Sequence, residues 1–417
     1  MDEASGPHPR PRLDGVVHFS AVTPPVSRHH QGKLPRTAQP HPWRNSTVIR
    51  TRSRRAALLG GIAVVSLAAT ACSESADTTA TGGEGSAAVE GLSGTTGTLS
   101  AEGASSQQKA MDLFGTVYQQ QVPGAQFNYT ASGSGSGQKQ FIAAQVAFGG
   151  SDSPLSDEQV PEAAKRCGGN EAWHLPLVIG PVAVAYHLEG VSDDIVLSPE
   201  VIAKIFSGKI SSWDDAAIAA LNDGVDLPDT PINVVYRSEE SGTSDNFQKF
   251  LKAAAPGEWD TTGKSFPSAT GAGANGSNGV VTEVSKTNGG ITYVEAGFAT
   301  EQGLSIAQID FGEGAVELND KSVGKALDNL TYKTEGHNMV VDSTKLFEMK
   351  TEGAYPLVLT TYEIVCSAGY DEETSKMVKD FLNVALNTQN ERLEKQGYIP
   401  VSGNYAKKLK DAVDAIQ

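Results

Sequence analysis

The chain has 417 residues, 39% of them apolar and 44 of them glycine, which is enough for two domains or one pair of lobes. The net charge of −16 is unevenly spread, because residues 1–71 hold ten basic and three acidic side chains and the remainder holds 23 basic and 46 acidic ones. An acidic body without a basic patch repels nucleic acid, and three cysteines without a CxxC spacing argue against a cysteine zinc site.

The first recognisable segment is an export signal. The basic run Arg50–Arg55 is followed by the apolar run Ala56–Ala71, which is too short for an ordinary membrane-spanning helix. The residues Ala69-Thr-Ala-Cys72 resemble a bacterial lipobox, so we expect Cys72 to be lipidated and to become the mature N-terminus. An ordinary cleavage site with an incidental cysteine is the alternative.

Two further N-terminal segments have no periodicity. Residues 1–47 contain eight of the 20 prolines, and we interpret residues 1–71 as an extension followed by a lipoprotein signal peptide. Residues 73–97 are rich in Ser, Thr, Gly, Ala and Glu, which predicts a flexible tether over 72–97 with a reach of roughly 27 Å. One lipid chain anchors weakly, so we expect more than one acyl chain.

From Thr98 onward strands and helices alternate, which predicts an α/β fold with largely parallel sheets. The expected elements are, in order, a helix through Leu113–Tyr118, a strand at Gln126–Thr130, a helix at Gln138–Ala144, strands at Leu177–Tyr186 and Pro231–Tyr236, a helix through Phe247–Ala254, a strand at Ile291–Val294, and helices at Ser375–Leu386 and near Ala406–Ile416.

Three turns rich in serine and glycine each precede an expected helix. They are Gly103–Ser106, Ser132–Gly137 and Ser241–Ser244. Glycine lets backbone N–H groups approach a ligand, and a helix N-terminus carries about half a positive charge, so such a turn can bind an anion. Each turn alone is also typical of a plain N-cap. The spacings match neither a Walker A loop nor a nucleophile elbow.

Two charged residues stand out beside these turns. Arg237 ends the strand that precedes the third turn, and Asp152 follows Phe148-Gly-Gly-Ser. A carboxylate repels an anion unless a proton lies between them; phosphate keeps a proton near neutral pH and sulfate does not. A site built around that hydrogen bond rejects the analogue lacking it by roughly 10⁴–10⁵. Stabilisation of its own turn is the alternative role for Asp152.

Several segments together resemble the phosphate-binding proteins of bacterial ABC transporters. They are Leu99–Ser105, Ser132–Gly137, Phe148–Asp152, Lys204–Asp214, Val235–Ser244 and Gly289–Val294. The resemblance covers about Gly97 to Ser402 and implies a two-lobed α/β periplasmic-binding-protein fold of type II, with two crossover strands and a ligand in the cleft. It places lobe I at 98–176 and 348–417, lobe II at 177–347, and the crossings near Leu175–Gly180 and Phe347–Pro356.

The resemblance also implies a ligand set. It comprises Ser105, Ser106, Ser134, Asp152, Arg237, Ser241, Gly242 and Thr243, with Glu239 steadying the arginine where the family has Asp. Arg237 is the one cation of this set and offers a charge-assisted fork. Asp152 is expected to accept the phosphate proton. Ser106 stands where the family often has an aromatic residue and is expected to contribute through its backbone.

The implied function is that of a receptor rather than an enzyme. We expect a monomeric, lipid-anchored protein on the outer face of the cytoplasmic membrane that binds inorganic phosphate and delivers it to an ABC permease, without cofactor or metal. A receptor for another oxyanion, such as sulfate, and a secreted phosphatase are the alternatives. Cys167 and Cys366 each lie near a crossing, and outside the cytoplasm they are expected to form a disulfide; free buried thiols are the alternative.

Overall fold

The computed structural model describes residues 88–267, 269–328 and 330–417. The expected N-terminal extension, signal peptide and lipidated Cys72 lie outside the described residues. Within the described ranges, no helix has both the length and the apolar character needed to cross a membrane.

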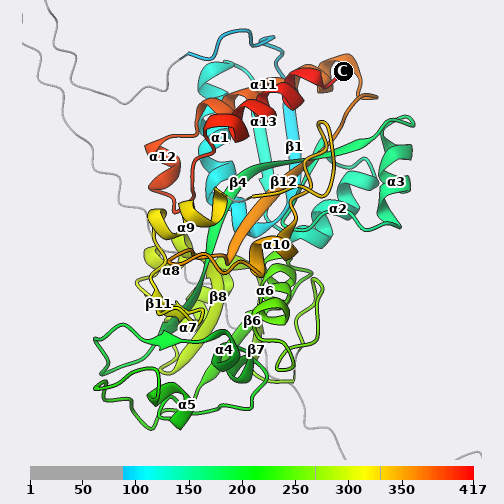
Figure 1. Ribbon diagram of the computed structural model, residues 1–417. Helices are drawn as coiled ribbons and strands as arrows, with labels where there is room; N and C mark the ends of the chain where they lie inside the picture. The colour runs from blue at the N-terminus through cyan, green and yellow to red at the C-terminus, as the bar shows by residue number, and fades with distance from the viewer. Residues whose placement is uncertain (1–87, 268, 329) are drawn as a thin grey trace, which may run out of the picture. The chain divides into compact units, whose positions relative to one another are not determined.

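Helices and strands alternate along the chain (Figure 1). Two long strands, β4 and β12, divide the element order into three stretches: before β4, between β4 and β12, and after β12. The elements up to β4 are β1 (Thr98–Gly103), the 3-10 helix η1 (Ser105–Gln107), α1 (Gln108–Gln121), β2 (Gln126–Thr130), α2 (Ser134–Ile142), β3 (Phe148–Ser151), α3 (Gln159–Arg166) and β4 (Ala172–His187). Between the long strands lie β5 (Val196–Leu197), α4 (Pro199–Phe206), α5 (Ala216–Ala219), β6 (Asn233–Arg237), α6 (Gly242–Ala254), β7 (Ala272–Ala274), α7 (Gly276–Val284), β8 (Gly290–Glu295), α8 (Ala296–Glu301), β9 (Ser305–Ile306), β10 (Gln308–Asp310), β11 (Ala315–Val316), α9 (Asp320–Leu327) and α10 (Ser343–Phe347). The chain ends with β12 (Val358–Cys366), α11 (Glu372–Asn387), α12 (Glu391–Glu394) and α13 (Gly403–Ala415).

The larger, nine-stranded sheet has the order β2-β1-β3-β12-β4-β8-β6-β7, with β9 beside β4, and β11-β10-β5 form a separate small sheet. The expectation of largely parallel pairing holds at both ends of this path, where β1 is parallel to β2 and β3, and β6 is parallel to β7 and β8. It is wrong in the centre, where β3–β12, β12–β4 and β4–β8 are antiparallel. The reason is that β4 carries the chain out of the first set of strands and β12 brings it back, so the two strands run in opposite directions.

The strand β4 belongs to two lobes. Its residues Ala172–Pro181 pair with β12, and Val182–His187 pair with β8. We call β1–β3 with α1–α3, α11 and α13 the first lobe, and β6–β8 with α6–α8 the second lobe; the C-terminus lies in the first (Figure 1). The return segment does not form the expected strand over Phe347–Pro356, because α10 ends at Phe347 and β12 begins only at Val358.

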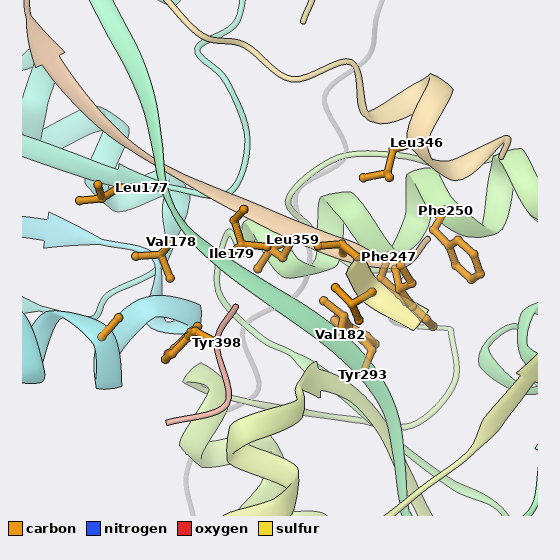
Figure 2. Packing of buried hydrophobic residues seen from close by; sticks show 14 of the residues in the cluster. Leu177, Val178, Ile179, Val182, Phe247, Phe250, Tyr293, Leu346, Leu359 and Tyr398 are labelled. Carbon is orange, nitrogen blue, oxygen red and sulfur yellow. The ribbon is translucent and has the colours of Figure 1, made fainter. Parts of the chain in front are cut away.

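One apolar core connects the two lobes. Leu177 and Ile179 of β4 and Leu359 of β12 belong to the same buried cluster as Phe247 and Tyr293 of the second lobe (Figure 2). Burial of this kind is the main stabilising contribution in a folded domain. The strands that join the lobes therefore lie inside a packed core, and the residues at their ends are held in fixed positions.

The expected disulfide is present. Cys167 and Cys366 are bonded with a Cα–Cα distance of 5.3 Å, which ties the end of α3 to the end of β12 beside the first lobe.

Residues 88–97 do not continue the expected flexible tether. Asp380 of α11 accepts hydrogen bonds from Ser93 N at 2.8 Å, Ser93 Oγ at 2.7 Å and Gly94 N at 3.1 Å, so this stretch is fastened to the first lobe.

Candidate functional site

The predicted ligand residues all lie buried at the junction of the two lobes. Ser105 and Ser106 form the turn η1 directly after β1, Ser134 is the first residue of α2, and Asp152 follows β3. On the other side Arg237 ends β6, Ser241 caps α6, and Gly242 and Thr243 begin that helix. The carboxyl ends of parallel strands share one edge of a sheet, and here the edges of both lobes meet, which is the usual place for a ligand in such folds.

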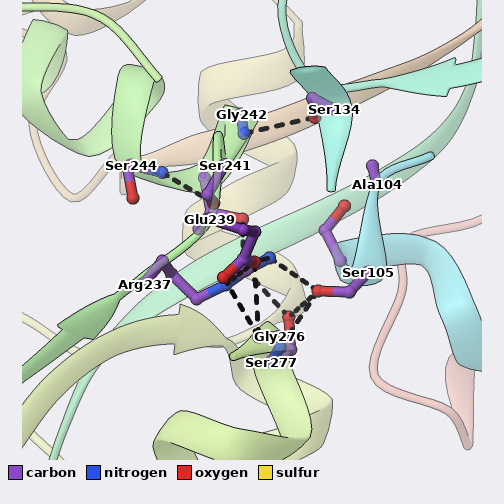
Figure 3. Close-up of polar contacts among 12 residues, drawn as sticks. Ala104, Ser105, Ser134, Arg237, Glu239, Ser241, Gly242, Ser244, Gly276 and Ser277 are labelled. Carbon is purple, nitrogen blue, oxygen red and sulfur yellow. Dashed lines mark hydrogen bonds and ion pairs between the residues drawn. The ribbon is translucent and has the colours of Figure 1, made fainter. Parts of the chain in front are cut away.

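Arg237 is the centre of one group of contacts (Figure 3). Its Nη2 donates to Ser105 Oγ at 2.6 Å, and its Nη1 donates to Thr243 Oγ1 at 3.1 Å. Its Nε donates to Glu239 Oε1 at 2.6 Å, so Glu239 reaches the arginine despite its longer arm. Burial lowers the pKa of Arg237, but Glu239 and Glu295 raise it by more, so the guanidinium remains charged.

Asp152 is the centre of a second group. Its Oδ1 accepts from Ser106 Oγ at 2.6 Å and from Thr361 Oγ1 at 2.7 Å, and its Oδ2 accepts from Ser134 Oγ at 3.2 Å. Burial, with a contribution from the negative charge of Glu295, raises the pKa of Asp152 to about 6. Ser106 therefore contacts Asp152 through its hydroxyl, whereas the sequence led us to expect a contribution through its backbone.

Three residues of this junction were not among the site residues predicted from the sequence. Ser277, the second residue of α7, accepts from Arg237 Nη1 at 3.2 Å and donates to Glu295 Oε2 at 2.7 Å. Glu295 ends β8 and also accepts from Thr243 Oγ1 at 2.7 Å. The third is Thr361 of β12. Ser277 carried the same signal as the other turns, a Gly/Ser turn that opens a helix, and Glu295 follows directly on the motif Gly289–Val294.

The lobes are closed on one another. The backbone N–H of Gly135 donates to Glu240 O at 3.0 Å, and Lys139 pairs with Glu240 at 2.7 Å. Ser134 Oγ accepts from Gly242 N at 3.2 Å, again across the junction. These bonds join the start of α2 to the residues that precede and begin α6, so the buried site depends on lobe closure.

Gly242 allows this close approach. An added Cβ would lie 2.5 Å from Asp152 Cβ and 2.7 Å from Asp152 Oδ2, and it would also overlap Ser134 Oγ. We therefore expect Gly242→Ala to oppose closure and to weaken ligand binding by about 5- to 150-fold, since a clash in a packed site costs typically 1–3 kcal/mol. Calorimetric titration measures this. Gly279→Ala is the matched control, because its Cβ meets only Ala274, at 3.6 Å or more. An unchanged Kd for Gly242→Ala would show that closure does not need this contact.

The arrangement suits the capture of a small anion. In the residues that the structure describes, no group of three His, Cys, Asp or Glu side chains could hold a metal ion. The donors are one guanidinium, several hydroxyls and the N–H groups of helix starts, which stabilise negative charge in a buried site. Three buried or half-buried carboxylates, Asp152, Glu239 and Glu295, lie near Arg237 and offset its charge, so the hydroxyl and N–H dipoles would be needed beside the guanidinium to stabilise an anion here.

The fold and this junction define a two-lobed solute-binding protein, and comparison with known proteins agrees. The family model described as the PBP superfamily domain matches residues 88–389, so the chain belongs to that superfamily. It is 42% identical over 322 residues to phosphate-binding protein PstS 3 of Mycobacterium leprae, covering 76% of this chain and 87% of the relative. It is 41% identical over 370 residues to PstS 3 of Mycobacterium tuberculosis, covering 87% and 99%. At this identity and coverage the chain belongs to the PstS family of phosphate-binding proteins.

A solved structure confirms the architecture. A phosphate-binding protein from Stenotrophomonas maltophilia superposes with a TM-score of 0.56 at 20% identity, covering 76% of this chain and 93% of the other. At that identity the similarity concerns the fold. The predicted fold class and family are thus confirmed, and the family is one of binding proteins and not of enzymes.

Proposed function

We propose that this protein binds inorganic phosphate between its lobes and delivers it to the permease of an ABC importer. One observation carries the proposal. A buried guanidinium, Arg237, and a buried carboxylate, Asp152, both contact the serine-rich turn Ser105–Ser106 at the junction of the lobes. Its relatives at about 41% identity are named phosphate-binding proteins.

The proposed ligand set is the one expected from the sequence. Arg237 supplies the positive charge, Ser105, Ser134 and Thr243 supply hydroxyls, and the starts of η1 and α6 supply N–H groups. Asp152 accepts the proton that phosphate carries near neutral pH. Hydrogen bonds to charged groups contribute about 1.5–3 kcal/mol each. Several of them support a Kd of about 1 μM or below, equivalent to about −8 kcal/mol.

The position of the protein in the cell belongs to the same proposal. The export signal and the lipobox-like Ala69–Cys72 support an extracytoplasmic receptor that a lipid on Cys72 holds at the outer face of the cytoplasmic membrane. The acidic globular part carries phosphate as a monomer, and the permease of the importer is its partner.

Calorimetric titration of phosphate and of sulfate tests the function. The soluble chain from residue 73 onward is first freed of bound anion by partial unfolding and refolding. Tight phosphate binding, with no sulfate binding at millimolar concentration, is the expected result. Equal binding of both anions would contradict the assigned role of Asp152 and indicate a general oxyanion receptor. Binding of neither anion would contradict the proposal as a whole.

A further inference from the structure

A buried acid–amide contact lies next to the site, and neither of its two side chains belongs to the proposed ligand set. In the part of the chain that the structure describes, the buried oxygens without a hydrogen-bond partner include Gln107 Oε1 and Glu363 Oε1. These two atoms belong to side chains that are bonded to each other, because Gln107 Nε2 donates to Glu363 Oε2 at 3.2 Å. The second hydrogen of Gln107 Nε2 goes to Tyr129 Oη, at 3.1 Å.

The protonation state of Glu363 decides whether this contact is stable. An ionised carboxylate has only acceptors, so both Oε1 atoms would remain unpaired in a fully buried place. Burying an unpaired polar group is costly, and burying an unpaired charge is far more so. A single proton on Glu363 Oε1 would turn this oxygen from an acceptor into a donor. The acceptor it lacks is available on the side chain to which Glu363 is already bonded, since Gln107 Oε1 is also without a partner, and a second hydrogen bond between acid and amide would satisfy both oxygens.

The surroundings of the pair support this arrangement. Glu363 lies on β12 opposite Gly150 of β3 and Leu175 of β4. A side chain at position 150 would collide with Gln107 Nε2 and lie 2.5 Å from Tyr129 Oη, so glycine leaves the space that Gln107 occupies. The contact is therefore part of how β3, β12 and η1 pack together.

We propose that Glu363 is protonated in the folded protein and that its neutral pair with Gln107 positions the Ser105–Gln107 turn of the anion site. Gln107 is the last residue of η1, and Ser105 and Ser106 of the same turn contact Arg237 and Asp152. Glu363 is thus a positioning residue, since it acts on the ligand through Gln107. Its effect on phosphate affinity rests on the function proposed above.

The electrostatics point the same way. The titratable groups facing the pair are Asp152 after β3, Tyr129 of β2 and Tyr398, whose hydroxyl donates to Ser106 O at 2.6 Å. Burial, with a contribution from Asp152, raises the pKa of Glu363 to about 8, and burial raises the pKa of Tyr129 well above its ordinary value. A negative charge on Glu363 would lie close to Asp152 and to a bound anion. Affinity should therefore fall as rising pH ionises Glu363.

Glu363→Gln tests the proposal, because glutamine copies the shape of the protonated acid and can donate the same hydrogen bond. Glu313→Gln, in an exposed turn of the loop between β10 and β11, is the matched control. The infrared spectrum of the wild type at neutral pH should contain the C=O band of a protonated carboxylic acid, sensitive to D₂O. That band should persist in Glu313→Gln and disappear in Glu363→Gln.

The pH dependence of stability gives a second, independent measurement. Since the folded pKa is raised, the folded state holds a proton that the unfolded state has released between the ordinary value of 4.5 and about 8. Stability conferred by the protonated pair is complete below 4.5 and is lost as pH rises toward 8. The unfolding constant of the wild type, relative to Glu363→Gln, should increase about tenfold per pH unit within this window.

Phosphate affinity is the third measurement. At pH 7 Glu363→Gln should bind phosphate about as well as the wild type, whereas Glu363→Leu, which leaves the Gln107 amide unpaired, should bind about tenfold more weakly. Above pH 8 the wild type should lose affinity relative to Glu363→Gln.

Several outcomes would overturn the proposal. They are a missing acid band, a flat difference in stability between pH 4.5 and 8, and failure of Glu363→Gln to fold, since that variant keeps the bond that the proton supplies. The infrared and unfolding measurements need no ligand. A wild type that does not bind phosphate would therefore contradict the function proposed above, while these two measurements still decide the state of Glu363.

Discussion

Arg237→Gln should weaken phosphate binding by about 30-fold to several thousand-fold, because truncating one partner of a buried charge pair costs 2–5 kcal/mol. Arg237 is 2% exposed and is the cation of the predicted ligand set. Its loss removes the charge-assisted bonds to the anion and leaves Glu239 and Glu295 uncompensated. Lysine should restore only part of the affinity, since a point charge cannot reproduce the fork that reaches Ser105 and Thr243.

Calorimetry at neutral pH gives the Kd, and thermal unfolding of the same samples shows whether the variant is folded. Lys165→Gln removes one positive charge from an exposed position on α3 and serves as the control. A folded Arg237→Gln protein whose Kd stays within about threefold of the wild type would mean that the guanidinium does not face the ligand.

Asp152→Asn should reduce the preference for phosphate over sulfate by at least about 100-fold, against the roughly 10⁴–10⁵ that a site of this kind can reach. In the wild type a carboxylate would face the anion, and sulfate at neutral pH has no proton to place between the two acceptors. The amide of asparagine can donate to sulfate. The expected gain is therefore in sulfate binding, with a smaller change for phosphate.

The pH dependence gives an independent test of Asp152. Its pKa is raised to about 6, so the acceptor form exists above pH 6 and is lost as pH falls through that value. Phosphate affinity of the wild type should fall below pH 6, and Asp152→Asn should lack this titration. Asp157→Asn, at an exposed position, controls for the loss of one carboxylate. Calorimetric titration of phosphate and of sulfate between pH 5 and 8 gives the Kd values for the wild type and both variants. Unchanged selectivity in Asp152→Asn would mean that Asp152 does not contact the anion.

The sequence was most informative where the structure is local. Turns of Ser and Gly before apolar periodic stretches predicted helix starts, and η1, α2 and α6 begin at those turns. Caps and turns depend on neighbouring residues, so their signals survive in a short window. The boundaries of the elements were predicted less well than their existence, and two elements begin earlier than expected. The helix expected from Gln138 begins at Ser134, inside its own Ser/Gly turn, and the strand expected from Leu177 begins at Ala172.

By itself, the sequence determined the class of fold and singled out a set of turns, one arginine and one aspartate that the fold brings to one junction; the export signal and the binding of a protonated anion stay predictions. Only the tertiary structure decided which groups meet. Glu295, Ser277 and Thr361 reach the site from three elements, and Gln107 and Glu363 pair across 256 residues. The contacts of Thr361 and Glu363 follow from the antiparallel return of β12 beside β4, which no local pattern encodes. Whether a buried carboxylate is a charge or a neutral donor depends on the neighbours that the fold brings to it.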